Sequence, residues 1–295
     1  MNERNLKIFY EVATKLNMTE AAGNLFMSQP AVSQTIRDLE TGYDIRFFDR
    51  IGKRLYLTQA GEHFYQYVRR ILNLLDECSK TLKEIQGPNQ GRLRIGASAT
   101  IGTYILTGVI GKFRKHYPAV EVAITIENTR MITGMILENK VDFALVEGLV
   151  DSEEIKTEPF CDDELVFIVP PDHPWARMGD LDRKLLAQEK LIMREQGSGT
   201  REIIESVLRS QGVDYQVGLE LGNIEAIKKA VQVGLGISCL SKRCVQQEIE
   251  DQRIKIVRFK GLRMMRQFKL IFHQDKYLSN LFRNFIDFCR KEVVS

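Results

Sequence analysis

Residues 19–39 read TEAAGNLFMSQPAVSQTIRDL and contain two short helical patterns joined by a turn. The first pattern predicts a helix over 20–26, with Thr19 as its N-cap, because small apolar residues recur at helical spacing. Ser28 is the predicted N-cap of the second helix, and Pro30 suits its first turn, where a missing N–H does no harm. Two short helices joined in this way predict a helix-turn-helix.

The second helix has a polar, solvent-facing side, and a basic hairpin follows it. A helix that enters the major groove must be slim at its leading end, and amide side chains can pair with base edges. Residues 49–58 read DRIGKRLYLT and predict two strands with a basic tip, which would lie along the phosphates. The candidate DNA-contacting residues are Gln29, Ser33, Gln34 and Arg37 on the helix, and Arg50, Lys53 and Arg54 on the hairpin.

Net charge gives this interpretation little support. Residues 1–60 hold eight Lys and Arg against seven Asp and Glu, and the whole chain has 42 against 39, a net charge of +3. Helix-turn-helix geometry also occurs in proteins that never bind DNA. The prediction of DNA binding therefore depends on groove fit and on where the charges lie.

Length and composition predict a folded cytoplasmic protein of two or three domains. The 295 residues are 44% hydrophobic and 27% charged, as in ordinary globular domains. We expect no membrane span, because no apolar run approaches about 18 residues, and no signal peptide at the N-terminus. The five cysteines are scattered and form no C-x-x-C pair, so neither a disulfide framework nor a metal site is expected.

Residues 59–86 predict one long helix with a heptad seam. Its apolar positions follow a 4-3-4-3-4-3 spacing and are Phe64, Val68, Ile71, Leu75, Cys78, Leu82 and Ile85. The seam could pack on the core of its own domain, but the rest of the helix is mostly polar, which favours a partner helix and dimerisation. Gly87–Gly91 breaks the helix as a hinge.

From Arg92 onward, strand patterns alternate with helical patterns, which predicts two α/β lobes with parallel strands. Small and hydroxyl residues follow predicted strands at 96–102, 128–129 and 197–201. Hydroxyls and the N–H groups of helix N-termini favour a small anion. Glu147 is the exception, and it could bind a cationic or hydroxyl group, or hold Arg201 or another cation across the cleft. Each stretch alone could be an ordinary helix cap; together they predict a ligand-binding cleft.

The sequence does not favour an enzyme. Ser98 lies at a strand-to-helix turn, but the second glycine of a nucleophile elbow is missing. The Gly234-Leu235-Gly236 fragment follows a helix rather than a strand, so it predicts a tight turn and no dinucleotide cofactor. We therefore expect no catalytic residues and no cofactor.

The stretch 21–40, with Ser28-Gln29-Pro30-Ala31-Val32-Ser33 at its centre, and Leu57–Gly61 resemble the LysR-type transcriptional regulators. The resemblance continues through the whole chain. It implies a winged helix-turn-helix, a dimerising linker helix, a two-lobed effector domain like a periplasmic binding protein, and a tetramer built as a dimer of dimers. The corresponding domains are 1–58, 59–87, 91–161 with 268–295 for lobe I, and 162–267 for lobe II.

The resemblance also implies functional residues. Ser28 and Pro30 join the groove-facing set, and the effector site would be lined by Ser98, Ala99, Thr100, Thr129, Glu147, Ser198, Thr200 and Asn223. One departure is Tyr43-Asp44, where the family usually has Leu-Gly, because Asp tolerates a left-handed helix cap less well than Gly. Residues 101–106, 145–148 and 197–201 are most similar to the CysL-like branch, which is associated with sulfur metabolism and implies a small sulfur oxyanion as effector.

The residues leave two functions from different classes open. The first is a DNA-binding transcriptional regulator whose DNA binding or oligomer arrangement responds to a small, anionic effector. The alternative is a cytosolic solute-binding module whose N-terminal domain docks a protein instead of duplex DNA.

Overall fold

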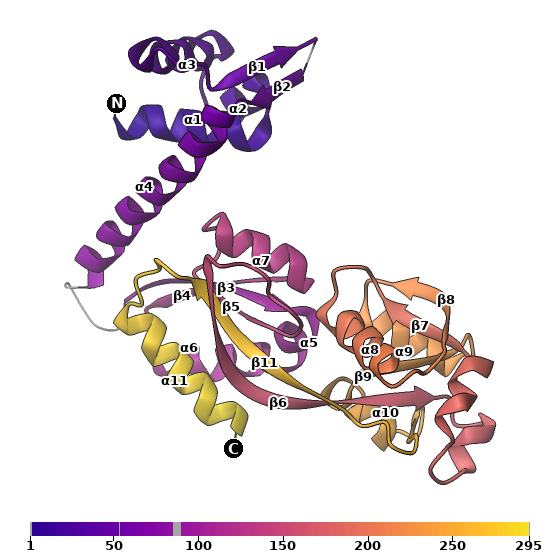
Figure 1. The fold of residues 1–295 in the computed structure, drawn as a ribbon. Coiled ribbons are helices and arrows are strands. Elements are labelled where there is room, and N and C mark those ends of the chain that lie inside the picture. The colour runs from indigo at the N-terminus through magenta and orange to yellow at the C-terminus, as the bar shows by residue number, and fades with distance from the viewer. Residues whose placement is uncertain (1, 53, 85–89, 295) are drawn as a thin grey trace. The chain divides into compact units, whose positions relative to one another are not determined.

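A computed structural model of the chain describes residues 2–52, 54–84 and 90–294 (Figure 1). The chain divides into two compact units, Met1–Lys83 and Glu84–Ser295. Lys53 of the predicted hairpin, Ile85 of the seam and residues 87–89 of the hinge lie outside the described residues.

The first unit has the predicted helix-turn-helix, hairpin and long helix. Its elements are α1 (Glu3–Lys15), α2 (Met18–Asn24), α3 (Gln29–Tyr43), β1 (Phe48–Ile51), β2 (Arg54–Leu57) and α4 (Gln59–Glu84). The hairpin strands β1 and β2 are antiparallel, with Phe48 opposite Leu57. The ring of Phe9 in α1 contacts Phe47 and Phe64, so the first helix, the hairpin and α4 share one core.

The caps at the start of α2 and at the end of α3 can be compared with those predicted from the sequence. Thr19 is not the N-cap of α2: the helix begins at Met18, and Asn17 Oδ1 accepts from the N–H groups of Thr19 and Glu20. Asn reaches two of the unpaired N–H groups of the first turn, which makes it one of the strongest N-caps. The C-cap of α3 is Asp44 at φ 54°, so an Asp does occupy the left-handed position expected for Gly.

The two halves of α4 have different surroundings. Val68 is buried in the core of its own unit, and Phe64 and Ile71 pack against that core. Further along, Leu75 and Leu82 are 41% and 60% exposed. The first half of the seam therefore packs within its own domain, and the second half is an apolar stripe that the described residues leave exposed.

The second unit is built on one mixed sheet. Its elements are β3 (Gly91–Ser98), α5 (Ala99–Ile101), η1 (Gly102–Leu106), α6 (Thr107–His116), β4 (Val120–Glu127), α7 (Thr129–Leu137), β5 (Phe143–Val146), β6 (Ile155–Val169), η2 (Pro174–Arg177), η3 (Arg183–Gln188), β7 (Lys190–Arg194), α8 (Gly199–Ser210), β8 (Gln216–Leu221), α9 (Ile224–Gln232), β9 (Ile237–Ser241), η4 (Lys242–Cys244), α10 (Gln246–Glu250), β10 (Lys255–Val257), β11 (Met264–His273) and α11 (Asn280–Val294). Hydrogen bonds join the strands in the order β4-β3-β5-β11-β6-β9-β7-β8, and β10 pairs with β6.

The predicted parallel pairing occurs at both ends of this sheet and fails in its middle. Strand β3 is parallel to β4 and β5, and β7 is parallel to β8 and β9. Strands β6 and β11 are long and antiparallel, and they run from one end of the unit to the other (Figure 1). The prediction of parallel strands is therefore wrong for these two, which are the crossings between the lobes.

Buried apolar side chains form separate clusters at the two ends of the sheet. Helices α6 and α11 cover one face at the first end, where Phe113 meets Phe285 edge to face (Figure 1). We call this end lobe I and the other end, whose clusters contain Trp175 and Ile227, lobe II. Because β6 and β11 contribute side chains to clusters in both lobes, the polar residues at their crossing lie between the two cores.

Candidate DNA-binding surface and effector site

The predicted DNA-contacting residues lie on the outer side of α3 and on the hairpin. Gln34, Arg37, Arg50 and Arg54 are exposed, as are Ser28 and Pro30, whereas Gln29 and Ser33 are half-buried. Gln34 Nε2 donates to Asp38 Oδ1 at 2.7 Å, a bond between positions one helical turn apart. The buried face of α3 carries Val32, Ile36 and Leu39, so the polar side is left to face a partner.

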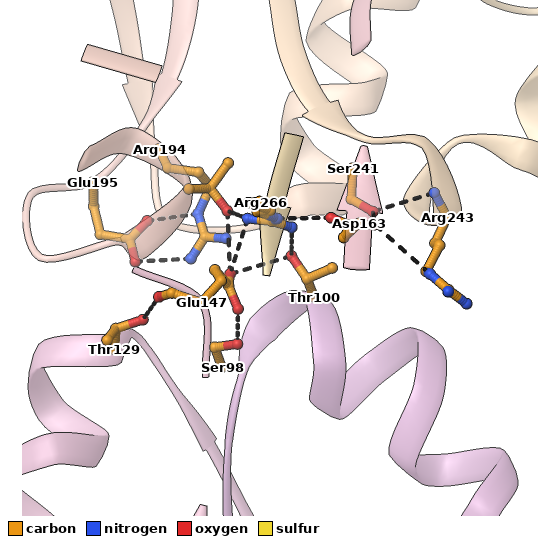
Figure 2. Close-up of polar contacts among 11 residues, drawn as sticks. Ser98, Thr100, Thr129, Glu147, Asp163, Arg194, Glu195, Ser241, Arg243 and Arg266 are labelled. Carbon is orange, nitrogen blue, oxygen red and sulfur yellow. Dashed lines mark hydrogen bonds and ion pairs between the residues drawn. The ribbon is translucent and has the colours of Figure 1, made fainter. Parts of the chain in front are cut away.

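In the second unit, hydroxyl groups from both lobes converge on the carboxylate of Glu147 (Figure 2). Ser98, at the end of β3, donates to Glu147 Oε2. Thr100 in α5 and Thr200 in α8 donate to Oε1 at 3.3 and 3.1 Å. All four residues are at most 2% exposed. Lobe I supplies Ser98, Thr100 and Glu147, and lobe II supplies Thr200, so the carboxylate joins the two lobes.

The cation opposite Glu147 is Arg266, which sequence reasoning missed. Arg266 Nη1 lies 3.7 Å from Glu147 Oε1 and donates to Thr200 at 2.8 Å, and Nε donates to Asp163 Oδ2 at 2.6 Å. Arg201, named as one possible cation, pairs instead with Glu205 and Glu220. We call Ser98, Thr100, Glu147, Asp163, Thr200 and Arg266 the inter-lobe cluster; Figure 2 labels all of them except Thr200.

A second missed arginine lies beside the inter-lobe cluster. Arg194, at the end of β7, is 4% exposed and makes a bidentate ion pair with Glu195, at 2.7 and 2.8 Å (Figure 2). Both missed arginines had a sequence signal. Arg194 directly follows the predicted strand 191–193, and ligands of open sheets bind beyond the ends of strands. Arg266 alternates with exposed residues of β11, as the buried Met264 and Phe268 do.

The backbones of the two lobes touch next to Glu147. A Cβ added to Gly199 would overlap the carbonyl oxygen of Glu147, and Gly148 has a φ of 110°, which favours glycine. Thr129 Oγ1 donates to that same carbonyl oxygen at 2.5 Å, and the N–H of Arg130 donates to Gly197 O at 3.3 Å. Glycine at 199 is therefore required for this close approach.

The other predicted lining residues have different surroundings. Ser198 is buried at the N-cap of α8, one residue before Gly199. Ala99 is half-buried and packs against a core cluster of lobe II. Asn223 is exposed and caps α9, where its Oδ1 accepts from the N–H groups of Glu225 and Ala226. The described contacts thus bring Ser98, Thr100, Thr129, Glu147 and Thr200 together and leave Asn223 at its helix end.

A second contact joins the lobes through Tyr104. Its hydroxyl donates to Glu225 of α9, and its ring lies 5.3 Å from Lys228 Nζ. Lys228 is buried and pairs with Glu225 at 2.7 Å and Glu248 at 2.9 Å. Burial raises the pKa of Tyr104, and the bond to Glu225 raises it further. Burial also opposes the charge of Lys228, but its two carboxylate partners outweigh this and raise its pKa.

Comparisons with known families cover almost the whole chain. Residues 4–62 match the model of the bacterial regulatory helix-turn-helix protein, lysR family, and residues 86–294 match the LysR substrate binding domain. Among the described residues, no helix is long and apolar enough to span a membrane.

Individual relatives agree with the family models. YeiE of Escherichia coli (strain K12), an HTH-type transcriptional regulator, is 39% identical over 97% of this chain and 96% of its own length. The regulatory domain of CcmR from Synechocystis PCC6803, solved with 2-PG, is 32% identical, with a TM-score of 0.64 over 68% of this chain and 97% of that domain. Full-length OxyR from Pseudomonas aeruginosa shares the fold, with a TM-score of 0.73 over 99% of this chain and 94% of that one at 20% identity. The chain is thus a regulator and not an enzyme, and it belongs to the LysR family of DNA-binding transcriptional regulators with an effector-binding domain.

Proposed function

We propose that the inter-lobe cluster binds a small oxyanion, and that this binding changes the regulator's DNA binding or the arrangement of its oligomer. The observation that carries the proposal is the convergence of the Ser98, Thr100 and Thr200 hydroxyls and the Arg266 guanidinium on one buried carboxylate. Hydroxyl donors and a guanidinium are the groups that bind an oxyanion. In the free protein, the carboxylate of Glu147 accepts hydrogen bonds from the three hydroxyls and forms an ion pair with Arg266.

An oxyanion that uses these donors must displace the carboxylate of Glu147. Two anions cannot share the same buried donors without strong repulsion, because a low-dielectric site screens charge poorly. The site therefore has two arrangements, one with Glu147 on the donors and one with the effector on them. The effector shifts the balance only by its difference in affinity for the two arrangements.

The donors suit a small oxyanion, and we propose a sulfur oxyanion because the CysL-like resemblance implies one. Arg194 lies beside the cluster and offers a guanidinium of which Glu195 uses one edge, so a second positive group can contact the ligand. The CcmR regulatory domain was solved with 2-PG, which makes that compound the first competitor to test against the sulfur oxyanions.

We propose that the N-terminal unit reads DNA through Ser28, Gln29, Pro30, Ser33, Gln34 and Arg37, with Arg50, Lys53 and Arg54 on the phosphates. The exposed second half of α4 supports a dimer through that helix. We propose that the protein is cytoplasmic and forms a tetramer as a dimer of dimers. We propose domain limits at 1–58, 59–87, 91–161 with 268–295, and 162–267, and the separate buried clusters of the two lobes support the last two.

A thermal-shift panel on the full chain tests the effector proposal. Sulfate, sulfite, thiosulfate, phosphate and 2-PG are compared at constant ionic strength, with chloride as the reference. A ligand that binds only the folded protein raises its melting temperature. We expect at least one sulfur oxyanion to do so, and Thr100→Val to abolish the shift while Thr107→Val, on an exposed residue of α6, retains it. A panel with no shift, or an equal shift in Thr100→Val, would refute the proposal.

A further inference from the structure

A groove of about 670 Å³ lies beside the start of α3 in the N-terminal unit. Three parts of the unit line it: the turn between α1 and α2, with Lys15 and Asn17; the first residue of α3, Gln29; and the hairpin, with Arg50 and Arg54. Gln29, Arg50 and Arg54 belong to the predicted DNA-contacting set. Lys15 and Asn17 come from a part of the chain that the sequence pattern did not connect with DNA.

The groove gathers positive charge that the domain as a whole lacks. Residues 1–60 contain eight basic and seven acidic residues. Of the described residues that line the groove, the charged ones are Lys15, Arg50 and Arg54, and all three are basic. A concave surface with charges of one sign focuses the field and attracts an anionic partner.

We infer that this groove seats the sugar-phosphate backbone of one DNA strand, and that Lys15 is a phosphate-binding residue. The inference rests on the proposed DNA contacts of α3 and the hairpin, because the groove is continuous with both through Gln29 and Arg50. A strand that lies in this groove beside α3 and the hairpin also reaches Lys15, which lines the same groove. Phosphate contacts of this kind fix the register of the protein on the duplex and carry no sequence information.

In the free protein, Glu20 holds the Lys15 ammonium. The two groups are 3.2 Å apart, and both side chains are partly exposed, so the pair is weak and a phosphate can replace the carboxylate. Glu20 therefore competes with DNA for Lys15. Lys15 also lies in the last turn of α1, where a cation stabilises a helix end. A residue with only that structural role would change stability and leave the salt dependence of DNA binding unchanged.

The chain provides a matched control in Lys7. It lies on the same helix α1 and is exposed, its Nζ is 2.6 Å from Glu3, and it does not line the groove. Lys7→Ala and Lys15→Ala each remove one charge from the same helix. Any difference between the two variants in DNA binding therefore comes from position and not from net charge.

The experiment measures binding of the full chain to a labelled duplex of random sequence by fluorescence anisotropy at a series of salt concentrations. The slope of log affinity against log salt falls by about 0.9 for each lost phosphate contact with B-form DNA. We expect Lys15→Ala to weaken binding and to reduce the magnitude of the slope by about 0.9, which corresponds to one lost contact. Lys15→Arg and Lys7→Ala should keep the wild-type slope, and Glu20→Gln should strengthen binding.

Circular dichroism and melting temperature confirm that each variant is folded before its DNA binding is compared. A slope for Lys15→Ala equal to that of the wild type, or equal losses in Lys15→Ala and Lys7→Ala, would overturn the groove assignment. Either result would leave the proposed contacts of α3 and the hairpin untouched, because Gln29→Ala and Arg50→Ala test those separately on the same duplex.

Discussion

Arg266 and Asp163 lie directly opposite each other on the antiparallel strands β11 and β6, and Arg266 Nε is 2.6 Å from Asp163 Oδ2. Both side chains are 1% exposed. The guanidinium of Arg266 also reaches Glu147 and the hydroxyl of Thr200. The crossing between the lobes thus contains one buried cation that serves two buried carboxylates.

Replacing Arg266 by Met should destabilise the effector-binding unit by about 3–5 kcal/mol, because two buried carboxylates lose their partner. Urea unfolding of the full chain, followed through the transition of this unit, measures the loss. Arg243→Met is the matched control: Arg243 is 3.7 Å from the same Asp163, but its side chain is 42% exposed. We expect its loss to be below about 1 kcal/mol. Equal losses in the two variants would contradict the role given to Arg266.

Sequence reasoning found the helix-turn-helix and both lobes because local patterns specify them. Ser28 with Pro30, and the alternation of strands and helices, needed no tertiary information. Sequence reasoning also identified Glu147 as an exception, because a carboxylate does not itself bind an anion. It did not identify Arg266 as the partner, because strand pairing across the crossing brings together residues 119 positions apart in the sequence.

Other misses have the same physical origin. Asn17 and Thr19 are both residue types that cap helices, and the sequence pattern favours Thr19 as the N-cap of α2. The path of the backbone decides between them, because it brings Asn17 Oδ1 to the N–H groups of Thr19 and Glu20. The seam of α4 follows one heptad pattern, yet its first half is buried in its own core. A periodic pattern shows which face is apolar and cannot show which neighbour covers it.

Glu147→Gln should increase the affinity for a small oxyanion. The amide keeps the shape of the carboxylate and removes its charge, so the effector no longer displaces an anion from the donors. Isothermal titration with the best ligand of the thermal-shift panel measures the change. Glu127→Gln, which neutralises an exposed carboxylate at the end of β4, is the control and should leave affinity unchanged. Weaker binding by Glu147→Gln would mean that Glu147 holds the ligand instead of competing with it.

The Tyr104 contact should make stability depend on pH through Glu225. Burial raises the pKa of Glu225, but hydrogen bonds from Lys228 and Tyr104 outweigh this, and the net shift is downward. A lowered pKa contributes stability above the unfolded-state value of about 4 and loses it as pH falls through the folded-state value.

Glu225→Gln should therefore be less stable than the wild type at neutral pH, and the difference should vanish in acid. Urea unfolding from neutral pH to below about pH 4 tests this. Glu121→Gln is the control, since its pair with Arg92 at 3.4 Å is on the surface. A difference that persists unchanged in acid would exclude the carboxylate charge as its cause.

Leu75→Asp should separate the chains that pair through α4 and so lower the assembly state. Leu75 is 41% exposed in the single chain and belongs to the half of the α4 seam that its own domain does not cover. A charge there would be buried without a partner in a helix pair. Sedimentation velocity measures the assembly state. Asn73→Asp introduces the same charge on the opposite side of the helix and should leave the assembly intact. An assembly state equal to that of the wild type in Leu75→Asp would show that another surface holds these chains together.

Gln34→Ala should cost about 1–3 kcal/mol of discrimination at one base pair, with little loss on random DNA. Gln34 Nε2 is engaged by Asp38, so its Oε1 is available to accept from the amino group of adenine or cytosine. Competition between the promoter fragment upstream of its own gene and its single-base variants measures this preference. Thr41→Ala, at the exposed far end of α3, is the control and should keep the wild-type preference. Equal weakening of Gln34→Ala on promoter and random duplexes would assign Gln34 to the backbone contacts, and the base-reading role would then fall to the remaining residues of α3.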